Sequence, residues 1–200
     1  FGGQHPDYDE IPDNWTGNPL DCSDLNNAYA EAKRFSEMCC TLYREQHHLN
    51  VVIVRCFAFV GPYLPLNANY AIGNFISNAI AGGAITVNGA GTEQRSYLYT
   101  ADLAVWLWTI LARGESGAII NVGSDKSYSI LEVAQKVADV FAVEEVLVRG
   151  IPNEKKSTSR YVPSIEIARE VYDLDMTTNL TEAIWRTATW YGWRSGGSRI

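Results

Sequence analysis

The sequence predicts an α/β protein, and three stretches of the chain carry that prediction. Residues 28–43 place apolar side chains at the 3.6-residue spacing of a helix with one buried face. Residues 51–57 form a β-branched, mostly apolar run, which is typical of a strand covered on both faces in a parallel sheet. Residues 103–111 form a strongly apolar helical stretch, and the strand expected at residues 118–123 then returns to the sheet.

The residues that flank the first helix predict an irregular segment before it and a solvent-exposed end after it. Prolines among Asp, Asn and Gly make residues 3–27 an irregular connection, and Asn26 or Asn27 is placed to cap the helix. The helix is expected to run to His47 and His48, whose imidazoles suit exposed helix carbonyls. A metal role would need a third ligand, and the sequence offers none near them, so a solvated helix end is favoured.

The later elements follow from periodicity and caps. Helices are expected at residues 71–81, 129–141 and 180–193, and short strands at residues 85–87, 95–99 and 146–148. The first two of these strands are expected to be joined by a tight turn at residues 88–91. Asp102 is expected to cap the apolar helix, Ser129 opens a capping box, and Trp106 and Trp108 are expected to serve packing.

Composition excludes several classes of protein. The 200 residues carry 46% hydrophobic and 20% charged residues, which is ordinary for a globular protein. A net charge of −7 without clustered Lys and Arg argues against nucleic-acid binding. No segment is long and apolar enough to predict a membrane span, and the beginning carries no signal-peptide pattern. The four cysteines have no zinc-site spacing and are expected to be reduced thiols, as in a cytoplasmic protein.

Tyr29 and Lys33 form the candidate catalytic pair. They stand four residues apart, so they lie one turn apart on the same side of the predicted helix. A phenol is a poor proton acceptor at neutral pH, and an ammonium beside it favours the phenolate. Tyr29 would therefore be the acid/base and Lys33 would tune it. On this motif alone, a Tyr and a Lys that merely flank a buried helix face remain an equal alternative.

Further motifs follow this pair in a fixed order. They occupy residues 51–62, 74–76, 94–99 with 102–103, and 121–123. With Tyr29 and Lys33, this order and spacing resemble the extended short-chain dehydrogenase/reductase family, the NAD-dependent nucleotide-sugar epimerases, dehydratases and decarboxylases. The stretch from Tyr29 to Glu37 and the stretch from Gln94 to Tyr99 resemble most the UDP-glucuronate decarboxylases, and next the dTDP-glucose 4,6-dehydratases.

The resemblance implies a cofactor and its contacts. The cofactor would be NAD, with Tyr29 and Lys33 beside it and Lys33 reaching the nicotinamide ribose. Phe57, at the end of its strand, would face the nicotinamide. The family commonly has Asn where this chain has Ala58, so one expected substrate contact is lost or supplied elsewhere, and the identity of the sugar is left open.

The resemblance also implies three substrate-binding residues. Asn74 would reach towards the nucleotide sugar, although a surface Asn with only local bonds is an equal alternative. Arg95 would hold the diphosphate, because a planar, permanently charged fork suits it; the alternative is an ion pair with Glu93. Arg160 would close over the diphosphate, and solvated loop charges are its equal alternative. It belongs to the basic cluster of Lys155, Lys156 and Arg160.

The fold implied is the carboxy-terminal portion of a Rossmann-type parallel sheet plus a small α/β substrate-binding lobe. The expected division assigns residues 1–57 and 101–125 to the NAD-binding domain and residues 62–98 and 126–200 to the nucleotide-sugar-binding lobe. Phe1 and Gly2 resemble the end of a family strand, so the Gly-rich phosphate loop and the catalytic Ser/Thr would lie upstream.

The expected function is modification of a nucleotide-diphosphate sugar through a 4-keto intermediate. Decarboxylase, 4,6-dehydratase and epimerase activities are not separated by these residues, and the isolated chain is expected to be inactive. The alternative is a sugar-nucleotide-binding fragment without catalysis. No metal, nucleic acid or membrane is expected as a partner, and the intact enzyme is expected to be a cytoplasmic homodimer.

Overall fold

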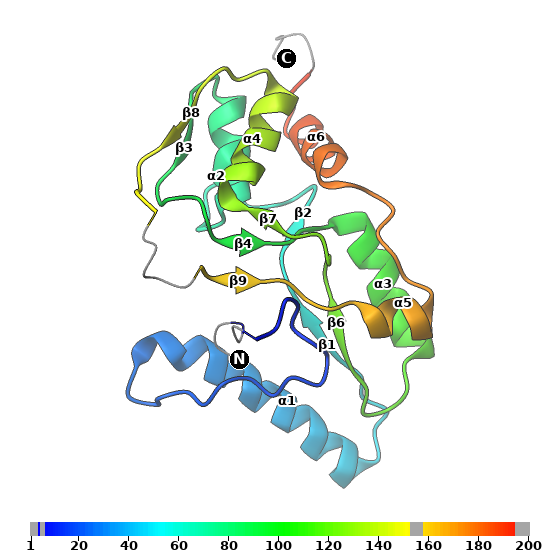
Figure 1. Ribbon diagram of the computed structural model, residues 1–200. Coiled ribbons are helices and arrows are strands. Elements are labelled where there is room, and N and C mark those ends of the chain that lie inside the picture. Colours follow the sequence, from blue (N-terminus) through cyan, green and yellow to red (C-terminus); the bar gives the residue numbers. More distant parts are fainter. Residues whose placement is uncertain (1–3, 5–6, 153–157, 195–200) are drawn as a thin grey trace.

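The computed structural model describes residues 4, 7–152 and 158–194, and its elements form two groups with short strands between them (Figure 1). The helices are α1 (Ala28–His47), α2 (Ala71–Ile80), α3 (Thr100–Arg113), α4 (Ile130–Phe141), α5 (Glu166–Tyr172) and α6 (Leu180–Trp190), and a 3-10 turn, η1 (Leu25–Asn27), precedes α1. The strands are β1 (Ile53–Cys56), β2 (Phe59–Val60), β3 (Ile85–Val87), β4 (Gln94–Arg95), β5 (Leu98–Tyr99), β6 (Ile119–Val122), β7 (Tyr128–Ser129), β8 (Val146–Val148) and β9 (Arg160–Tyr161).

Parallel pairing dominates, as the apolar strands predict. β1 pairs in parallel with β6, with Ile53 opposite Ile119, and β2 pairs in parallel with β5. β3 pairs in parallel with β8. In the three-stranded sheet, β4 lies between β7, which is antiparallel to it, and β9, which is parallel. The α/β class is therefore confirmed.

The prediction of a hairpin at residues 85–99 is wrong. β3 pairs with β8 and β4 pairs with β7 and β9, so the 88–91 turn does not bring β3 and β4 together. The backbone N–H of Gly150 donates to the carbonyl oxygen of Gly89 at 3.1 Å. A Cβ on Gly150 would lie 2.4 Å from the carbonyl carbon of Gly89, so this approach beyond β3 and β8 requires glycine.

Each of the two groups of elements has its own hydrophobic core. One core joins α2, α4 and α6 with β3 and contains Ile72, Phe75, Ile76, Ile85, Val133, Val137 and Ile184. The other joins α3 and α5 with β5 and β6 and contains Leu98, Trp106, Ile110, Ile120, Val122, Ile165 and Tyr172. Figure 1 shows the first group at the top and the second group below it.

The buried face expected for α1 is not found. The helix has the predicted bounds, but it has no buried residue, and Phe35, Met38 and Leu42 are 64%, 60% and 46% exposed. β1 is likewise only half-buried and ends at an exposed Cys56. The expectation of burial failed because periodicity shows which residues share a face but not whether another element covers it.

The caps agree with prediction in part. Ser129 forms the expected capping box with Glu132 at the start of α4. Asn27 occupies the N-cap position of α1 without a side-chain capping bond, and Asp24 caps η1 instead. Asp102 is no cap: it lies within the first turn of α3 and accepts hydrogen bonds from Thr177 and Thr178.

The remaining predictions have mixed outcomes. Trp106 is 1% exposed and packs in the core as expected, whereas Trp108 is 71% exposed, so packing was the wrong prediction for it. His47 and His48 are exposed at the end of α1, as expected for a solvated helix end. Predictions that concern Phe1, Gly2, Lys155 and Lys156 lie outside the described residues.

The loop before α1 is irregular, as predicted, but it is anchored to the sheet. Its Ile11 N–H donates to the carbonyl of Val162 at 2.8 Å. The carboxylate of Asp13 accepts from the backbone N–H of Asn121 at 2.5 Å, and the Asn121 amide donates to the carbonyl of Ile11 at 2.8 Å. The loop therefore has a fixed path along the end of β6.

Candidate active site

The first turns of α1 bring Tyr29 and Lys33 together. The Lys33 Nζ lies 5.4 Å from the centroid of the Tyr29 ring, and Tyr29 is 75% exposed. The helical spacing predicts this pairing, and the structure places both side chains as expected. An accessible phenol with a neighbouring ammonium can exchange a proton with a bound molecule.

The pair lies near the carboxyl end of β1. Cys56 ends this strand, and although the residue is exposed, partial desolvation raises the pKa of its thiol, which the positive charge of Lys33 opposes. The Lys33 ammonium is thus close enough to act on the end of the strand. Ligands of parallel α/β sheets bind outside the carboxyl ends of the strands, so the proton-transfer pair is at the edge where such a ligand is expected.

Phe57 follows β1 and is covered on one side by Tyr161. Their ring centroids are 4.6 Å apart with planes inclined by 28°, which is a stacked arrangement. The prediction placed Phe57 against a nicotinamide and gave no role to Tyr161. The signal that could have indicated Tyr161 was its position beside Arg160 in a strand, where successive side chains point to opposite faces.

Arg95 and Arg160 do not form one cluster. In the register of β4 and β9, Arg95 lies opposite Tyr161 and Arg160 lies opposite Gln94. Because side chains alternate along strands, the two arginines point to opposite faces of this pair of strands. Arg95 donates to the carbonyls of Gln94 and Ser159 at 2.7 and 3.2 Å, and Arg160 donates to the carbonyl of Asp9 at 2.5 Å.

Asn74 lines a cavity of about 660 Å³ between α2, β3 and the turn after β3. The side-chain amide of Asn74, oriented by its surroundings, donates to the carbonyls of Ala68 and Leu66 at 3.0 and 3.2 Å. It therefore makes local bonds and also faces the cavity. Other amide side chains in the lining are Asn67, Asn69, Asn78 and Asn88. The cavity extends to Glu93, two residues before Arg95.

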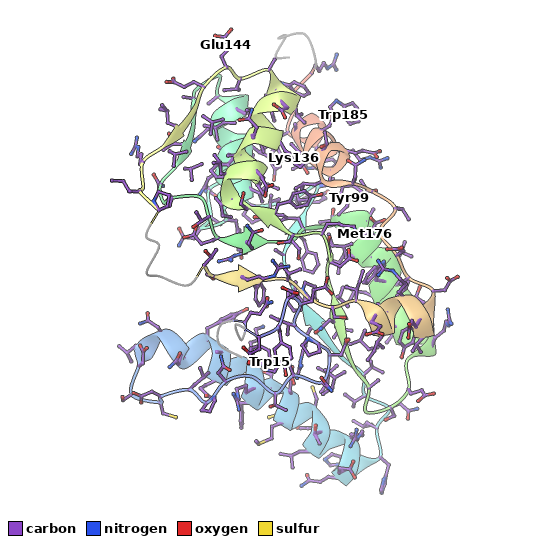
Figure 2. The ribbon with its side chains drawn as sticks, in the orientation of Figure 1. Trp15, Tyr99, Lys136, Glu144, Met176 and Trp185 are labelled. Atoms are coloured by element: carbon purple, nitrogen blue, oxygen red, sulfur yellow. The ribbon has the colours of Figure 1, made fainter. Side chains whose placement is uncertain are left out.

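A second cavity of about 520 Å³ lies between α4 and α6 and contains none of the predicted site residues. Lys136 of α4 and Trp185 of α6 line it (Figure 2). The described residues contain no group of three or more His, Cys, Asp or Glu side chains placed to hold a metal ion. Nor does any helix in the described part of the chain have the length and apolarity needed to cross a membrane.

Comparison with known sequences identifies relatives of about twice this length. UDP-glucuronic acid decarboxylase 5 of Arabidopsis thaliana is 27% identical over 175 residues, which cover 86% of this chain and 50% of the relative. UDP-glucuronic acid decarboxylase 1 of Danio rerio is 28% identical over 163 residues, 82% of this chain and 38% of the relative. The chain thus spans half or less of the length of these curated relatives.

Comparison with solved structures supports the fold. The UDP-glucose 4-epimerase of Thermus thermophilus in complex with NAD matches with a TM-score of 0.78 and 20% identity over 94% of this chain and 60% of that one. The dTDP-glucose 4,6-dehydratase of Bacillus anthracis in complex with NAD matches with a TM-score of 0.76 and 20% identity over 94% of this chain and 58% of that one. These likenesses confirm the Rossmann-type α/β fold.

The family model described as "NAD dependent epimerase/dehydratase family" matches residues 3–123. This match includes the Tyr29 and Lys33 helix, β1, α2 and β6. Because it extends over more than half of the sequence, the chain belongs to the NAD-dependent epimerase/dehydratase family.

Proposed function

We propose that this chain carries the proton-transfer and substrate-binding residues of an NAD-dependent enzyme that modifies a nucleotide-diphosphate sugar. The observation that carries the proposal is the exposed Tyr29 phenol with the Lys33 ammonium 5.4 Å from its ring, beside the carboxyl end of β1. Decarboxylation, 4,6-dehydration and epimerisation are all open, because each begins with oxidation of a sugar hydroxyl.

In this proposal Tyr29 accepts the proton that leaves the sugar hydroxyl at its phenolic oxygen. Lys33 holds its ammonium 5.4 Å from the Tyr29 ring, where its positive charge can stabilise the negative charge that develops on the phenolic oxygen during the transfer. NAD, when bound, supplies the reversible oxidation of the sugar carbinol to a ketone. The residues present fit the nicotinamide end of NAD, since Tyr29 and Lys33 offer a hydroxyl and an ammonium at the ligand-binding edge of the sheet, and Phe57 offers an apolar ring nearby.

The nucleotide is proposed to lie in the cavity beside Asn74. Its lining of amide side chains can donate to and accept from the polar edge of a base, and its volume of about 660 Å³ is in the range of small-molecule sites. The cavity extends to Glu93, two residues before Arg95, and this nearness supports the proposal that Arg95 binds the diphosphate. Arg160 lies on the opposite face of the strands. Its contact with the diphosphate, expected from the sequence, remains a prediction.

We also propose that the isolated chain has no turnover. The sequence contains no G-x-G-x-x-G run, and the relatives are about twice as long. Sugar-nucleotide binding without catalysis is therefore the second candidate function, and the cavity with Arg95 favours it because neither requires NAD. The division into an NAD-binding part (1–57 and 101–125) and a substrate lobe (62–98 and 126–200) belongs to the same proposal.

The substrate site is tested by calorimetric titration of the chain with UDP, dTDP, CDP and GDP. We expect one nucleotide to bind best and Arg95→Ala to weaken it roughly 10- to 100-fold, the loss of a charge-assisted contact. Arg44→Ala is the matched control: it removes an arginine near the far end of α1 and should leave binding unchanged. Equal binding by the unchanged chain, Arg95→Ala and Arg44→Ala would show that Arg95 does not contact the nucleotide. An absence of binding to every nucleotide would contradict the proposed substrate class.

Turnover is tested separately with NAD and UDP-glucuronate, the substrate class named by the plant and fish relatives. We expect no product from the isolated chain. Product formation would overturn that expectation. In that case Tyr29→Phe should abolish product formation while leaving nucleotide binding unchanged. Activity that survived Tyr29→Phe would exclude Tyr29 as the base.

Self-association and a cytoplasmic location complete the proposal. The apolar side chains of Phe35, Met38 and Leu42 on α1 are exposed, and such a face favours association of two copies. Sedimentation of the chain at several concentrations tests this. A species that keeps the mass of one copy at every concentration would exclude the homodimer for this chain.

A further inference from the structure

The cavity of about 520 Å³ between α4 and α6 has a preformed apolar lining. Val140 and Leu180 line it with aliphatic groups, and Tyr128 and Trp185 line it with aromatic rings. Leu180 is a buried member of the core that joins α2, α4 and α6, and Val140 and Tyr128 pack against that core. The lining is therefore held in place without a ligand, and the volume is within the range of small-molecule sites.

Lys136 brings a positive charge without a counter-charge to this cavity. Its Nζ lies 5.3 Å from the centroid of the Tyr128 ring. The carboxylate of Glu132, one turn earlier on α4, accepts instead from the backbone N–H of Ser129 at 2.6 Å in the capping box. Within the part of the chain that the structure describes, the Lys136 ammonium makes no hydrogen bond and no ion pair. A half-buried ammonium of this kind is available to pair with an anion.

The other polar groups of the cavity limit the charge of that anion. The Glu182 carboxylate also lines the cavity, and Arg186 partly neutralises it at 2.6 Å. A remaining negative charge here repels a doubly charged phosphate more than a singly charged carboxylate. The side-chain oxygen of Asn179 accepts from the backbone N–H of Glu182 at 3.0 Å, which leaves the Asn179 amide group as a donor. The cavity therefore favours a ligand with one negative charge.

We propose that this cavity is a binding site for a small aromatic carboxylate. The carboxylate pairs with the Lys136 ammonium, the Asn179 amide donates to it, and the aromatic ring of the ligand packs against the Trp185 indole. Trp185 is 46% exposed, so its ring is accessible for this contact (Figure 2). The inference does not rest on the proposed function, because none of these residues belongs to the proposed NAD or sugar-nucleotide sites.

The charge requirement is tested by calorimetric titration of the chain with cinnamate and with its neutral analogue cinnamamide. We expect cinnamate to bind about 5-fold or more tightly than cinnamamide. Lys136→Gln should weaken cinnamate about 5- to 10-fold and leave cinnamamide unchanged, whereas Lys136→Arg keeps the charge and should retain the affinity. Lys126→Gln is the matched control, because the Lys126 side chain is 65% exposed and lies outside the cavity.

The position of the bound probe is tested by the indole N–H resonances in a nitrogen–proton correlation spectrum. The resonance of Trp185, identified by its loss in Trp185→Phe, should shift when cinnamate is added. Trp108 is the control for unspecific contact with exposed rings, because it is 71% exposed on α3, and its resonance should stay in place.

Several results would decide against the aromatic carboxylate site. They are an absence of cinnamate binding, equal affinities for cinnamate and cinnamamide, or a loss in Lys136→Gln no greater than that in Lys126→Gln. Tighter binding of phenyl phosphate than of cinnamate would exclude a preference for a single charge. If Lys136→Gln does not fold, the two probes on the unchanged chain and on Lys136→Arg decide. None of these results affects the proposed function, which the nucleotide titrations with Arg95→Ala test at the other cavity.

Discussion

Glu37 and Arg55 form a bidentate ion pair that joins α1 to β1. The Arg55 Nε lies 2.8 Å from one carboxylate oxygen of Glu37, and the Nη2 lies 2.9 Å from the other. The remaining guanidinium nitrogen, Nη1, donates to the carbonyls of Asp13 and Trp15 at 2.9 and 2.8 Å. Figure 2 shows Trp15 in the loop beside α1. One guanidinium therefore holds helix, strand and loop, and through the helix it positions Tyr29 and Lys33.

Loss of this ion pair should destabilise the fold. Its side chains are 12% and 19% exposed, so Glu37→Gln would remove the carboxylate charge from an ion pair that is largely shielded from water. We expect the free energy of unfolding in urea to fall by about 2 kcal/mol. The control is Glu45→Gln, which breaks the more exposed Arg44–Glu45 pair and should cost less than about 0.5 kcal/mol. Equal losses in the two variants would show that the Glu37 pair contributes no more than a surface contact.

A buried carboxylate on α3 makes a second stability prediction. Asp102 is 5% exposed and accepts from the backbone N–H groups of Thr177 and Thr178 at 3.2 and 3.1 Å. Asp102→Ala would leave these donors without an acceptor and should lower the free energy of unfolding by about 2–3 kcal/mol. Asp102→Asn keeps an oxygen and should cost roughly half as much. Asp139→Ala, at an exposed position on α4, should change stability by less than about 0.5 kcal/mol, and a similar loss there would contradict a special role for Asp102.

Local signals in the sequence predicted the elements well. The helical period gave α1 its bounds, the capping box of Ser129 marked the start of α4, and the apolar runs gave β1 and β6. These features depend on residues within a few positions of each other. The same locality explains why Tyr29 and Lys33 could be paired from the sequence.

Long-range contacts could not be read in the same way. The turn after β3 gave no sign that the partner strand would be β8, about sixty residues later, and no pattern linked Asp102 to Thr177. Tyr161 was missed for this reason: its contact with Phe57 joins positions more than a hundred residues apart. Such pairs depend on tertiary packing and not on period or propensity.

Asp13 should make stability depend on pH in the acid range. Burial is the main cause that raises the pKa of its carboxyl, and hydrogen bonds from the backbone, including that of Asn121, oppose it. Because the folded pKa exceeds the unfolded pKa, the stability linked to protonation is fully present below about pH 4 and is lost as pH rises through the folded pKa. Asp13→Asn removes this titration. The free energy of unfolding of the variant, minus that of the unchanged chain, should therefore increase from about pH 3 to about pH 6.

Asp21 offers a control of opposite sign. Hydrogen bonds from Ser23 lower the pKa of the Asp21 carboxyl, so its ionised form favours the folded state. The corresponding difference for Asp21→Asn should fall, or stay flat, over the same range. A difference for Asp13→Asn that also falls would mean that the ionised Asp13 is stabilised by its partners and not opposed by burial.

Tyr97 should make stability depend on pH in the alkaline range. Burial raises the pKa of its phenol to about 12, against the smaller opposing effect of Arg95. An unfolded chain ionises a tyrosine near pH 10, so the stability that comes from keeping Tyr97 protonated is present below about pH 10 and is lost as pH rises towards 12. Tyr97→Phe has no phenol to ionise. The unchanged chain should therefore lose more free energy of unfolding than Tyr97→Phe between about pH 9 and about pH 11. Tyr70→Phe removes a phenol that is 57% exposed and is the matched control, because its alkaline loss should equal that of the unchanged chain. A Tyr97→Phe variant that loses stability in parallel with both would place the Tyr97 hydroxyl in water and not in the protein interior.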